Sequence, residues 1–551
     1  MIPANPPAGT RGADRLVQSL QRAGVRCLFT LSGNHIMPVF DALIGSGIRL
    51  IHTRHEAATV HMADAWSRLT GEVGVALVTG GPGHANAVSA LYTAQMAEAP
   101  VVLLSGHAPN SQLGMGAFQE MRQADLAAPV CKASWTCAGP DAVAPDLARA
   151  MQIARSGRPG PVHLSLPSDA LEGRADAATV PALEAFATHH QSLGFAQAQK
   201  LMAWLQRAQR PLILAGPSAC TRSGRTRTAA LQAACGVPVI CMESPRGVAD
   251  PALGALAEML VQADAVLLLG KRLDFTLKFG QAPTFAADAR WAQVDADEPE
   301  IERSRRALGP RLEITEQADL PSALMALQHA ASTPVADSGW LSAVRSAVDW
   351  RPPQWSTASS TQPARLHPVQ ALKPLQALLD SHPDAVFVSD GGEIGQWAQA
   401  CLRAPQRVLN GVAGSIGSAL PFALAARCAL PPEVPVVAVS GDGSIGFHLS
   451  EFDTAVRYRL PVVVLVGNDA RWNAEHQIQL KDYGPERLIG CELEPTRYDL
   501  ATAALGGHGE WVVDAQALPA ALQRAQASGL PACVNVMIEG LPAPLLRRPA
   551  P

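Results

Sequence analysis

Two polar residues follow neighbouring apolar runs near the C-terminal end, and their types suit cation binding. Asp442 stands in a Gly-Asp-Gly-Ser turn after the run 436–439, and Asn468 follows the run 461–466. Because buried parallel strands end at one edge of a sheet, we expect these side chains to lie close together. A carboxylate, an amide oxygen and the free N–H groups of a Gly-Ser turn suit Mg²⁺ carrying a diphosphate. Two ordinary strand-end turns are the alternative interpretation.

A second group with catalytic potential is the carboxyl of Glu56, in the stretch Arg54-His55-Glu56. A positioned carboxyl can perform general acid–base catalysis. The same residue could instead support a helix N-terminus or be a surface charge. A zinc site of the His-Glu-x-x-His kind is excluded, because Thr59 stands where the second histidine would be.

Apolar runs alternate with helical stretches along the chain, which predicts an α/β protein with three doubly wound parallel-sheet domains. The expected strands are 73–78, 101–104 and 162–166, then 211–215, 237–240, 265–269 and 291–294, and finally 385–388, 436–439 and 462–466. We place the domains at residues 1–180, 190–345 and 369–551, with a Ser/Thr/Pro-rich linker at 346–368.

The first and third predicted domains share a spacing that indicates an internal repeat. A glycine-rich turn at Gly80 is followed by the strand that starts at Pro100, and the turn at Gly441 is followed at the same distance by the strand that starts at Pro461. In this register Glu56 has a glycine, Gly417, as its counterpart. One domain therefore supplies an acid where the other has a loop of small residues, which suits a ligand bound between two similar domains.

Composition excludes several classes of protein. The 551 residues are 48% hydrophobic and 17% charged, with a net charge of −4, so a nucleic-acid-binding surface and a membrane span are not expected. The first twelve residues lack the apolar centre of a signal peptide. The ten cysteines include no Cys-x-x-Cys pair and are typical of the reduced thiols of a cytoplasmic protein.

Together these features resemble the thiamine diphosphate-dependent enzymes of the acetolactate synthase, benzaldehyde lyase and 2-hydroxyacyl-CoA lyase group. The resemblance covers nearly the whole chain, and its specific motifs are Arg54-His55-Glu56, Gly81-Pro82-Gly83-His84-Ala85-Asn86, Ala117-Phe118-Gln119-Glu120, Gly414-Ser415-Ile416-Gly417, Gly441-Asp442-Gly443-Ser444 and Gly467-Asn468-Asp469. It implies a pyrimidine-binding first domain, a Rossmann-like central domain and a diphosphate-binding third domain. It also implies a homodimer or homotetramer with active sites at the subunit interface.

The resemblance further implies roles for individual residues. Glu56 would hydrogen-bond the aminopyrimidine ring of thiamine diphosphate and favour the tautomer that removes the thiazolium proton. Asp442, Asn468 and the main-chain oxygen of Ala470 would bind Mg²⁺. The remaining cofactor-binding residues would be Pro82, Asn86, Gly414, Ile416, Gly441, Gly443 and Ser444.

The substrate pocket is expected to include the catalytic candidates His35 and Gln119. Alternatively, His35 is a solvent-facing or capping loop histidine, and Gln119 is a surface amide. The segment after the metal loop would form the pocket wall through Trp472, Glu475 and His476. Biosynthetic acetolactate synthases have Gly-Met-Val in this segment. The polar residues of this chain therefore weaken the expectation of acetolactate formation, while leaving cofactor activation unaffected.

The resemblance thus implies a carboligase, decarboxylase or acyloin lyase that acts on 2-oxo acids or 2-hydroxy ketones through an enamine intermediate. One alternative is a 2-hydroxyacyl-CoA lyase, although its basic tail is reduced here to Arg547 and Arg548. Another is a non-catalytic, cofactor-binding regulatory subunit. The central strand ends near Lys271 and Asp295 resemble loops that hold FAD, or ADP and CoA, so such a ligand is possible there.

Overall fold

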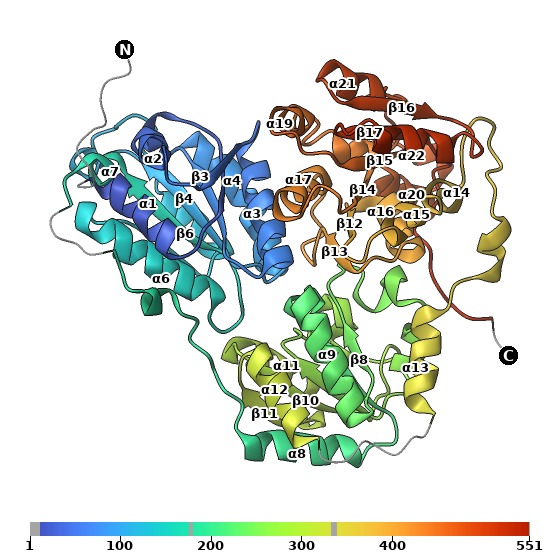
Figure 1. Ribbon diagram of the computed structural model, residues 1–551. Helices are drawn as coiled ribbons and strands as arrows, with labels where there is room; N and C mark the ends of the chain where they lie inside the picture. The colour runs from blue at the N-terminus through green and yellow to red at the C-terminus, as the bar shows by residue number, and fades with distance from the viewer. Residues whose placement is uncertain (1–10, 176–179, 332–338, 550–551) are drawn as a thin grey trace. The chain divides into compact units, whose positions relative to one another are not determined.

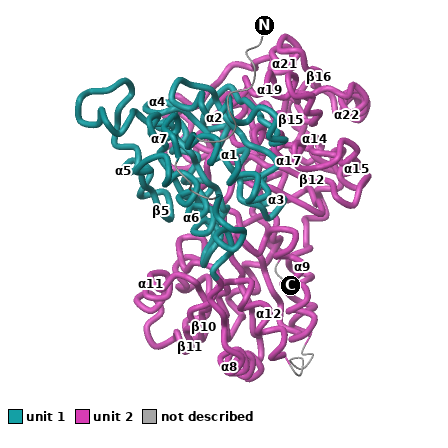
Figure 2. The backbone as a smooth tube through the Cα atoms, turned by 60° about the vertical axis from the view of Figure 1, so that its left-hand side comes forward, with its two compact units in different colours: residues 1–189 teal, residues 190–551 magenta. Residues whose placement is uncertain are grey.

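The computed structural model describes residues 11–175, 180–331 and 339–549 of the chain. It contains three parallel sheets with helices on their faces (Figure 1), which confirms the predicted fold class. The chain divides into two compact units, residues 1–189 and 190–551 (Figure 2). The first sheet lies in unit 1, and the other two lie in unit 2.

The sheet of unit 1 has six strands. Its order is β2 (Arg49–His52), β1 (Cys27–Thr30), β3 (Gly74–Val78), β4 (Val101–His107), β6 (Val162–Pro167) and β5 (Ala133–Thr136). One face is covered by α1 (Gly12–Arg22) and α6 (Val143–Arg155), whose leucines join a core with the strand residues Leu28, Leu77 and Leu104. Helices α3 (Glu56–Thr70) and α4 (Pro82–Met96) pack against each other, and each begins at the carboxyl end of a strand.

The central sheet has five strands, in the order β11 (Leu312–Gln317), β10 (Arg290–Asp295), β9 (Ala265–Leu269), β7 (Pro211–Ala215) and β8 (Val239–Cys241). Helices α8 (Phe195–Gln206), α9 (Arg222–Cys235) and α12 (Leu320–Ala330) share one apolar core with it. Helix α13 (Trp340–Asp349) belongs to the core on the other face. This helix extends past residue 345, the predicted end of the central domain. The predicted domain and linker boundaries stay predictions.

The third sheet repeats the strand order of the first. Its order is β13 (Gln406–Leu409), β12 (Val386–Ser389), β14 (Val436–Gly441), β15 (Val463–Asn468), β17 (Ala532–Met537) and β16 (His508–Val512). Numbered from its own first strand, each of these two sheets reads 2-1-3-4-6-5, which confirms the internal repeat. Helices α16 (Gly392–Cys401), α17 (Ala419–Ala429) and α22 (Leu518–Ala527) cover this sheet.

Two further findings bear on the class of protein. Within residues 11–175, 180–331 and 339–549, no helix combines the length and the apolar character that crossing a bilayer requires. All ten cysteines are free thiols, as the sequence predicted.

Candidate active site

Glu56 is the first residue of α3 and is largely buried, with 9% of its surface exposed. The helix is capped by its neighbour, because the His55 side chain accepts the backbone N–H of Ala57 at 3.1 Å. The carboxyl of Glu56 instead accepts a hydrogen bond from Asn86 Nδ2, at 3.1 Å from Oε2. Glu56 thus stands in the first turn of α3, where an acid supports a helix N-terminus, but its burial differs from that of a surface charge.

The start of α4 contains glycines that let its backbone approach Glu56, Thr79 and Gln119 closely. A Cβ on Gly83 would lie 2.8 Å from Thr79 Cγ2 and 3.2 Å from Glu56 Oε1. Gly81 has φ +59°, and a Cβ there would lie 2.7 Å from Gln119 Cβ. Such contacts are closer than packing allows, so only glycine fits these two positions. Pro82, between them, is exposed at the first position of the helix.

His35 and Gln119 come together around the same glycine-rich turn. His35 is 5% exposed, its Nδ1 lies 3.1 Å from Thr79 Oγ1, and burial lowers the pKa of its imidazole. The ring of Phe118 stacks on the His35 ring, with 5.9 Å between centroids. Gln119, the next residue, is half-buried and has φ +57°. His35, Gln119 and Glu56 are thus connected within unit 1 through Thr79 and Gly81–Gly83.

Asp442 and Asn468 lie at the same edge of the third sheet. Strands β14 and β15 are adjacent, and their ends are in register, with Gly441 opposite Gly467. Asp442 follows the first strand and is 2% exposed, and Asn468 ends the second and is fully buried. Asp442 Oδ2 accepts the backbone N–H of Arg471 at 3.2 Å.

The predicted main-chain ligand, Ala470, is held close to Asn468. Its N–H donates to Asn468 Oδ1 at 3.1 Å, and its carbonyl accepts the N–H of Leu493 at 2.8 Å. Ala470 has φ +59°, a left-handed conformation that is uncommon outside glycine. The short turn therefore folds back on the amide of Asn468.

Asp469 adds a second carboxyl that sequence reasoning did not assign. Its side chain hydrogen-bonds that of Asp442, and burial raises the pKa of both groups. The charge of Asp442 raises the pKa of Asp469 further. Two buried carboxyls in contact repel each other when ionised, so a divalent cation between them and the Asn468 amide would relieve a real electrostatic cost. The donor set consists of hard oxygens and fits Mg²⁺.

No group of three or more His, Cys, Asp or Glu side chains forms a metal site in residues 11–175, 180–331 and 339–549. The predicted magnesium set differs from such a group, because it uses one Asp together with an amide and a main-chain oxygen.

A cavity of about 180 Å³ opens above these strand ends. It is lined by Gly441–Ser444, Gly414, Ile416, Asp469, Trp472 and Glu475, among others. His476 is buried outside this lining. A Cβ on Gly443 would lie 2.6 Å from Trp472 Cζ3, so this turn stays narrow because residue 443 is glycine. The cavity brings most of the predicted diphosphate-binding residues together with two of the three predicted wall residues.

Asp390 fixes the loop that carries Gly414 and Ile416. It follows β12, and its buried carboxylate accepts hydrogen bonds from the backbone N–H of Gly417 at 2.9 Å and from Ser440 Oγ at 3.0 Å. Burial raises the pKa of Asp390 to about 6. Asp390 therefore connects the loop that carries Gly414 and Ile416 to β14, the strand that ends next to Asp442. A sequence pattern could have identified Asp390, because Ser-Asp-Gly-Gly at the end of β12 is similar to Ser-Gly-Asp-Gly at the end of β14.

Glu393 is a further acid in the cavity wall that the sequence analysis did not select. Its Oε2 accepts Arg246 Nη2 at 3.1 Å and the backbone N–H of Ala543 at 3.0 Å. Burial and the negative charge of the nearby Glu475 raise the pKa of Glu393, whereas the positive charge of Arg246 lowers it. Arg246 belongs to the loop after β8, so the central sheet contributes a cation beside this cavity.

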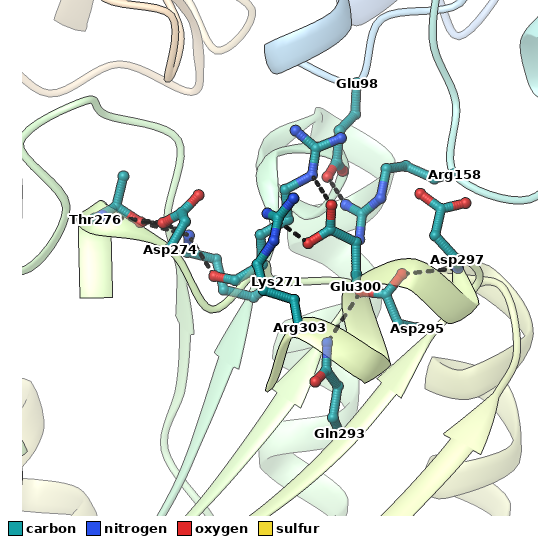
Figure 3. Close-up of polar contacts among 11 residues, drawn as sticks. Glu98, Arg158, Lys271, Asp274, Thr276, Gln293, Asp295, Asp297, Glu300 and Arg303 are labelled. Carbon is teal, nitrogen blue, oxygen red and sulfur yellow. Dashed lines mark hydrogen bonds and ion pairs between the residues drawn. The ribbon is translucent and has the colours of Figure 1, made fainter. Parts of the chain in front are cut away.

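The strand ends of the central sheet hold a separate cluster of charged side chains (Figure 3). Lys271 is 2% exposed, and its ammonium donates to Thr276 Oγ1 at 2.7 Å and lies 3.6 Å from Asp274. Asp295 Oδ1 accepts the backbone N–H of Asp297 at 3.0 Å. Lys271 and Asp295 thus already have partners within the chain, and a nucleotide or flavin there remains a prediction.

The two groups of residues have complementary chemistry. One contains a buried acid beside the glycine-rich start of a helix, together with a histidine and an amide. The other contains hard oxygen donors and backbone N–H groups at a sheet edge, which suits a metal-bound diphosphate.

Family comparisons agree with this division. Models of the thiamine pyrophosphate enzyme family match three parts of the chain: the N-terminal TPP binding domain matches residues 10–126, the central domain matches residues 198–327, and the C-terminal TPP binding domain matches residues 390–536. Glu56 and Gln119 lie in the first match, and Asp442 and Asn468 lie in the third.

Individual relatives are similar along most of their length. The acetolactate synthase large subunit of Mycobacterium tuberculosis and a probable acetolactate synthase of Mycobacterium bovis are each 34% identical over 544 residues, covering 97% of both chains. The 2-hydroxyacyl-CoA lyase 2 of Bos taurus is 33% identical over 552 residues, covering 91% of this chain and 85% of the relative.

Proposed function

Because the chain belongs to the thiamine pyrophosphate enzyme family, we propose that it forms or cleaves a carbon–carbon bond next to a carbonyl group, using thiamine diphosphate and Mg²⁺. The proposed substrates are 2-oxo acids such as pyruvate, or 2-hydroxy ketones. When bound, the cofactor supplies a nucleophilic carbon that stabilises an acyl anion equivalent. The residues of the chain activate, orient and enclose it.

The observation that carries this proposal is the environment of Glu56. Its carboxyl is buried, held by Asn86, and lies close to Gly83 at the start of α4. A carboxyl in such a place can exchange a proton with a ring nitrogen of a bound heterocycle. A subunit that only bound the cofactor for regulation would not need this acid, which speaks against the regulatory alternative.

We assign the third sheet the task of holding the diphosphate through Mg²⁺. Asp442, the Asn468 amide and the Ala470 carbonyl would bind the ion, and the Gly443-Ser444 turn would meet diphosphate oxygens. The contact between Asp442 and Asp469 supports a cation at this edge, because a positive charge offsets the repulsion between the two carboxylates.

We further infer that His35, Gln119, Trp472 and Glu475 surround the substrate. His35 can hold or move a proton at Nδ1, where it already meets Thr79 Oγ1. We also propose a homodimer or homotetramer with active sites at the subunit interface, where one subunit supplies Glu56 and another supplies Asp442. A cytoplasmic location is part of the proposal and is supported by the ten free thiols.

A 2-hydroxyacyl-CoA lyase is the second candidate, favoured by the similarity to the 2-hydroxyacyl-CoA lyase 2 of Bos taurus. The sequence between Asn473 and His476 differs from that of biosynthetic acetolactate synthases and does not favour acetolactate as the product. A flavin, or ADP and CoA, at the central strand ends remains a possible addition to either reaction.

The deciding experiment has two parts. Calorimetry first measures thiamine diphosphate binding with and without Mg²⁺, and we expect binding only with the ion. The loaded enzyme is then incubated with a panel of 2-oxo acids, acyloins and a 2-hydroxyacyl-CoA. Release of carbon dioxide or formation of acyloins from oxo acids supports the proposal, and formyl-CoA release supports the lyase. Absence of cofactor binding refutes both.

A further inference from the structure

Residues 113–121 form a loop that is held in shape by its own acidic side chain, Glu120. Glu120 Oε1 accepts the backbone N–H of Gly114 at 2.5 Å, and Oε2 accepts those of Gly116 and Ala117 at 3.1 and 3.0 Å. Gly114 and Gly116 have φ of +81° and +76°, which turns their N–H groups to the same side. Three converging N–H groups form an anion-binding nest, and this one is filled by the carboxylate of Glu120.

The apolar side chains of this loop are largely exposed. The loop lines a cavity of about 620 Å³, with Leu113, Gly114 and Glu120 among the lining residues. Met115 is 77% exposed, and Phe118 is 67% exposed although its ring stacks on that of His35. A segment without a packed apolar core relies on its hydrogen bonds for its conformation, and Glu120 provides three of them.

The same loop presents Gln119 to the candidate site. Gln119 adopts φ +57°, and its Cβ and carbonyl oxygen lie against Gly81, leaving no room for a Cβ there. Phe118 stacks on His35, and the loop ends where the Met121 carbonyl lies 2.9 Å from His107 Nε2. A side chain in this uncommon backbone conformation stays there only while its surroundings enforce it.

We propose that Glu120 is a positioning residue: by filling the nest of the loop it holds Gln119 against Gly81 and Phe118 against His35, and so sets the fit of the substrate. This inference rests on the proposed function for its effect on turnover, but the effect on the loop is independent of that function. Glu120 does not touch the reacting atoms; it acts through the backbone that carries Gln119.

Substituting glutamine for Glu120 tests this directly. A glutamine has one acceptor oxygen where the carboxylate has two, and its NH₂ group would face backbone N–H donors. Glu120→Asp keeps both oxygens on a shorter stem and should restore part of the effect. Glu184→Gln, which changes an exposed acid elsewhere in unit 1, is the matched control.

The full-length enzyme, loaded with thiamine diphosphate and Mg²⁺, is examined by hydrogen exchange and by kinetics with pyruvate. In Glu120→Gln we expect exchange at Gly114, Gly116 and Ala117 to accelerate at least about tenfold. We also expect KM to rise about tenfold with a smaller change in kcat, because the lost contact positions the substrate. Cofactor affinity and melting temperature should match those of Glu184→Gln.

Unchanged exchange at these three amides in Glu120→Gln would overturn the inference, and so would faster exchange with unchanged KM and kcat. An equal fall in kcat for Glu120→Gln and Glu120→Asp, without a change in KM, would also contradict it. If the wild-type enzyme turns over no 2-oxo acid, the proposed function fails, and the exchange rates still decide whether Glu120 holds the loop.

Discussion

Asn86 Nδ2 lies 3.1 Å from Glu56 Oε2 and joins the second turn of α4 to the first residue of α3. The bond fixes one carboxyl oxygen, and the other faces Gly83. An acid held in this way is oriented before any ligand arrives, which reduces the reorganisation that proton transfer requires.

Glu56→Gln should therefore lower kcat by about 10²- to 10⁴-fold, the usual contribution of a general acid or base. Affinity for thiamine diphosphate should change far less, because the amide retains the size of the carboxyl. Steady-state kinetics and calorimetry measure the two effects. Glu172→Gln, an exposed acid of unit 1, is the control. Wild-type turnover in Glu56→Gln would remove the proton-transfer role.

Asp442→Ala should abolish the Mg²⁺-dependent part of cofactor binding, because a hard carboxylate ligand is lost from the proposed site. Titration of thiamine diphosphate at several Mg²⁺ concentrations measures this loss. Asp453→Ala removes a surface acid of the same sheet domain and should leave binding intact. If Asp442→Ala binds the cofactor as tightly as Asp453→Ala, the assignment of the metal site is wrong.

Gly83→Ala should damage the site through sterics alone. The added methyl group would meet Thr79 at 2.8 Å and Glu56 at 3.2 Å. We expect a loss of about 1–3 kcal/mol in the free energy of unfolding, typical of overpacking, together with weaker cofactor binding. Gly139→Ala is the matched control, because a Cβ at Gly139 meets nothing within 4 Å. Denaturant titration and calorimetry separate the two losses.

The stability of unit 1 should decrease in acid because of His84. Burial lowers the pKa of His84 to about 4, and its ring lies 4.4 Å from that of His163. The unfolded chain, with a histidine pKa of about 6.5, binds the proton more readily. The contribution of the neutral ring is thus complete above pH 6.5 and is lost as the pH falls toward 4, by roughly 3 kcal/mol.

Hydrogen exchange of α4 amides between pH 4.5 and 7.5 measures this effect, after correction for intrinsic exchange rates. His84→Asn should remove a large part of the pH dependence, whereas the exposed His189→Asn should keep it. Equal pH dependence in wild type and His84→Asn would show that other groups dominate.

Mixing two inactive variants tests whether subunits share sites. If Glu56 and Asp442 of one site come from different chains, a dimer of one Glu56→Gln and one Asp442→Ala chain contains one site with both lesions and one intact site. Co-refolded or co-expressed mixtures should then regain activity that neither variant has alone. No recovery in verified heterodimers would place both residues of each site in one chain.

The sequence predicted the interior strands best, because a strand buried on both faces is a continuous apolar run. The runs 211–215 and 265–269 match β7 and β9 residue for residue. Short edge strands were missed, including β2, β13 and β16, and so were two interior strands, β1 and β17. An edge strand pairs with a neighbour on one side only, and its residues are often polar, as in Arg49–His52. Its composition therefore resembles that of a loop.

Residues of the candidate site could be predicted from the sequence where they lie at the end of a strand or a few positions after it. Asp442, Asn468 and Glu56 meet this condition. Asp390 and Glu393 also follow a strand, but their partners, Gly417 and Arg246, are distant in sequence, and no local pattern reports such contacts. Thr79, which touches His35, was hidden for the same reason.

The equal strand order of the first and third sheets has a consequence for how such a protein can evolve. Folding demands an apolar interior from each copy but places few demands on the turns at the strand ends. A duplicated module is therefore released from performing every task itself. One copy could specialise in proton chemistry and the other in ion binding, and neither change would disturb the architecture that both inherited.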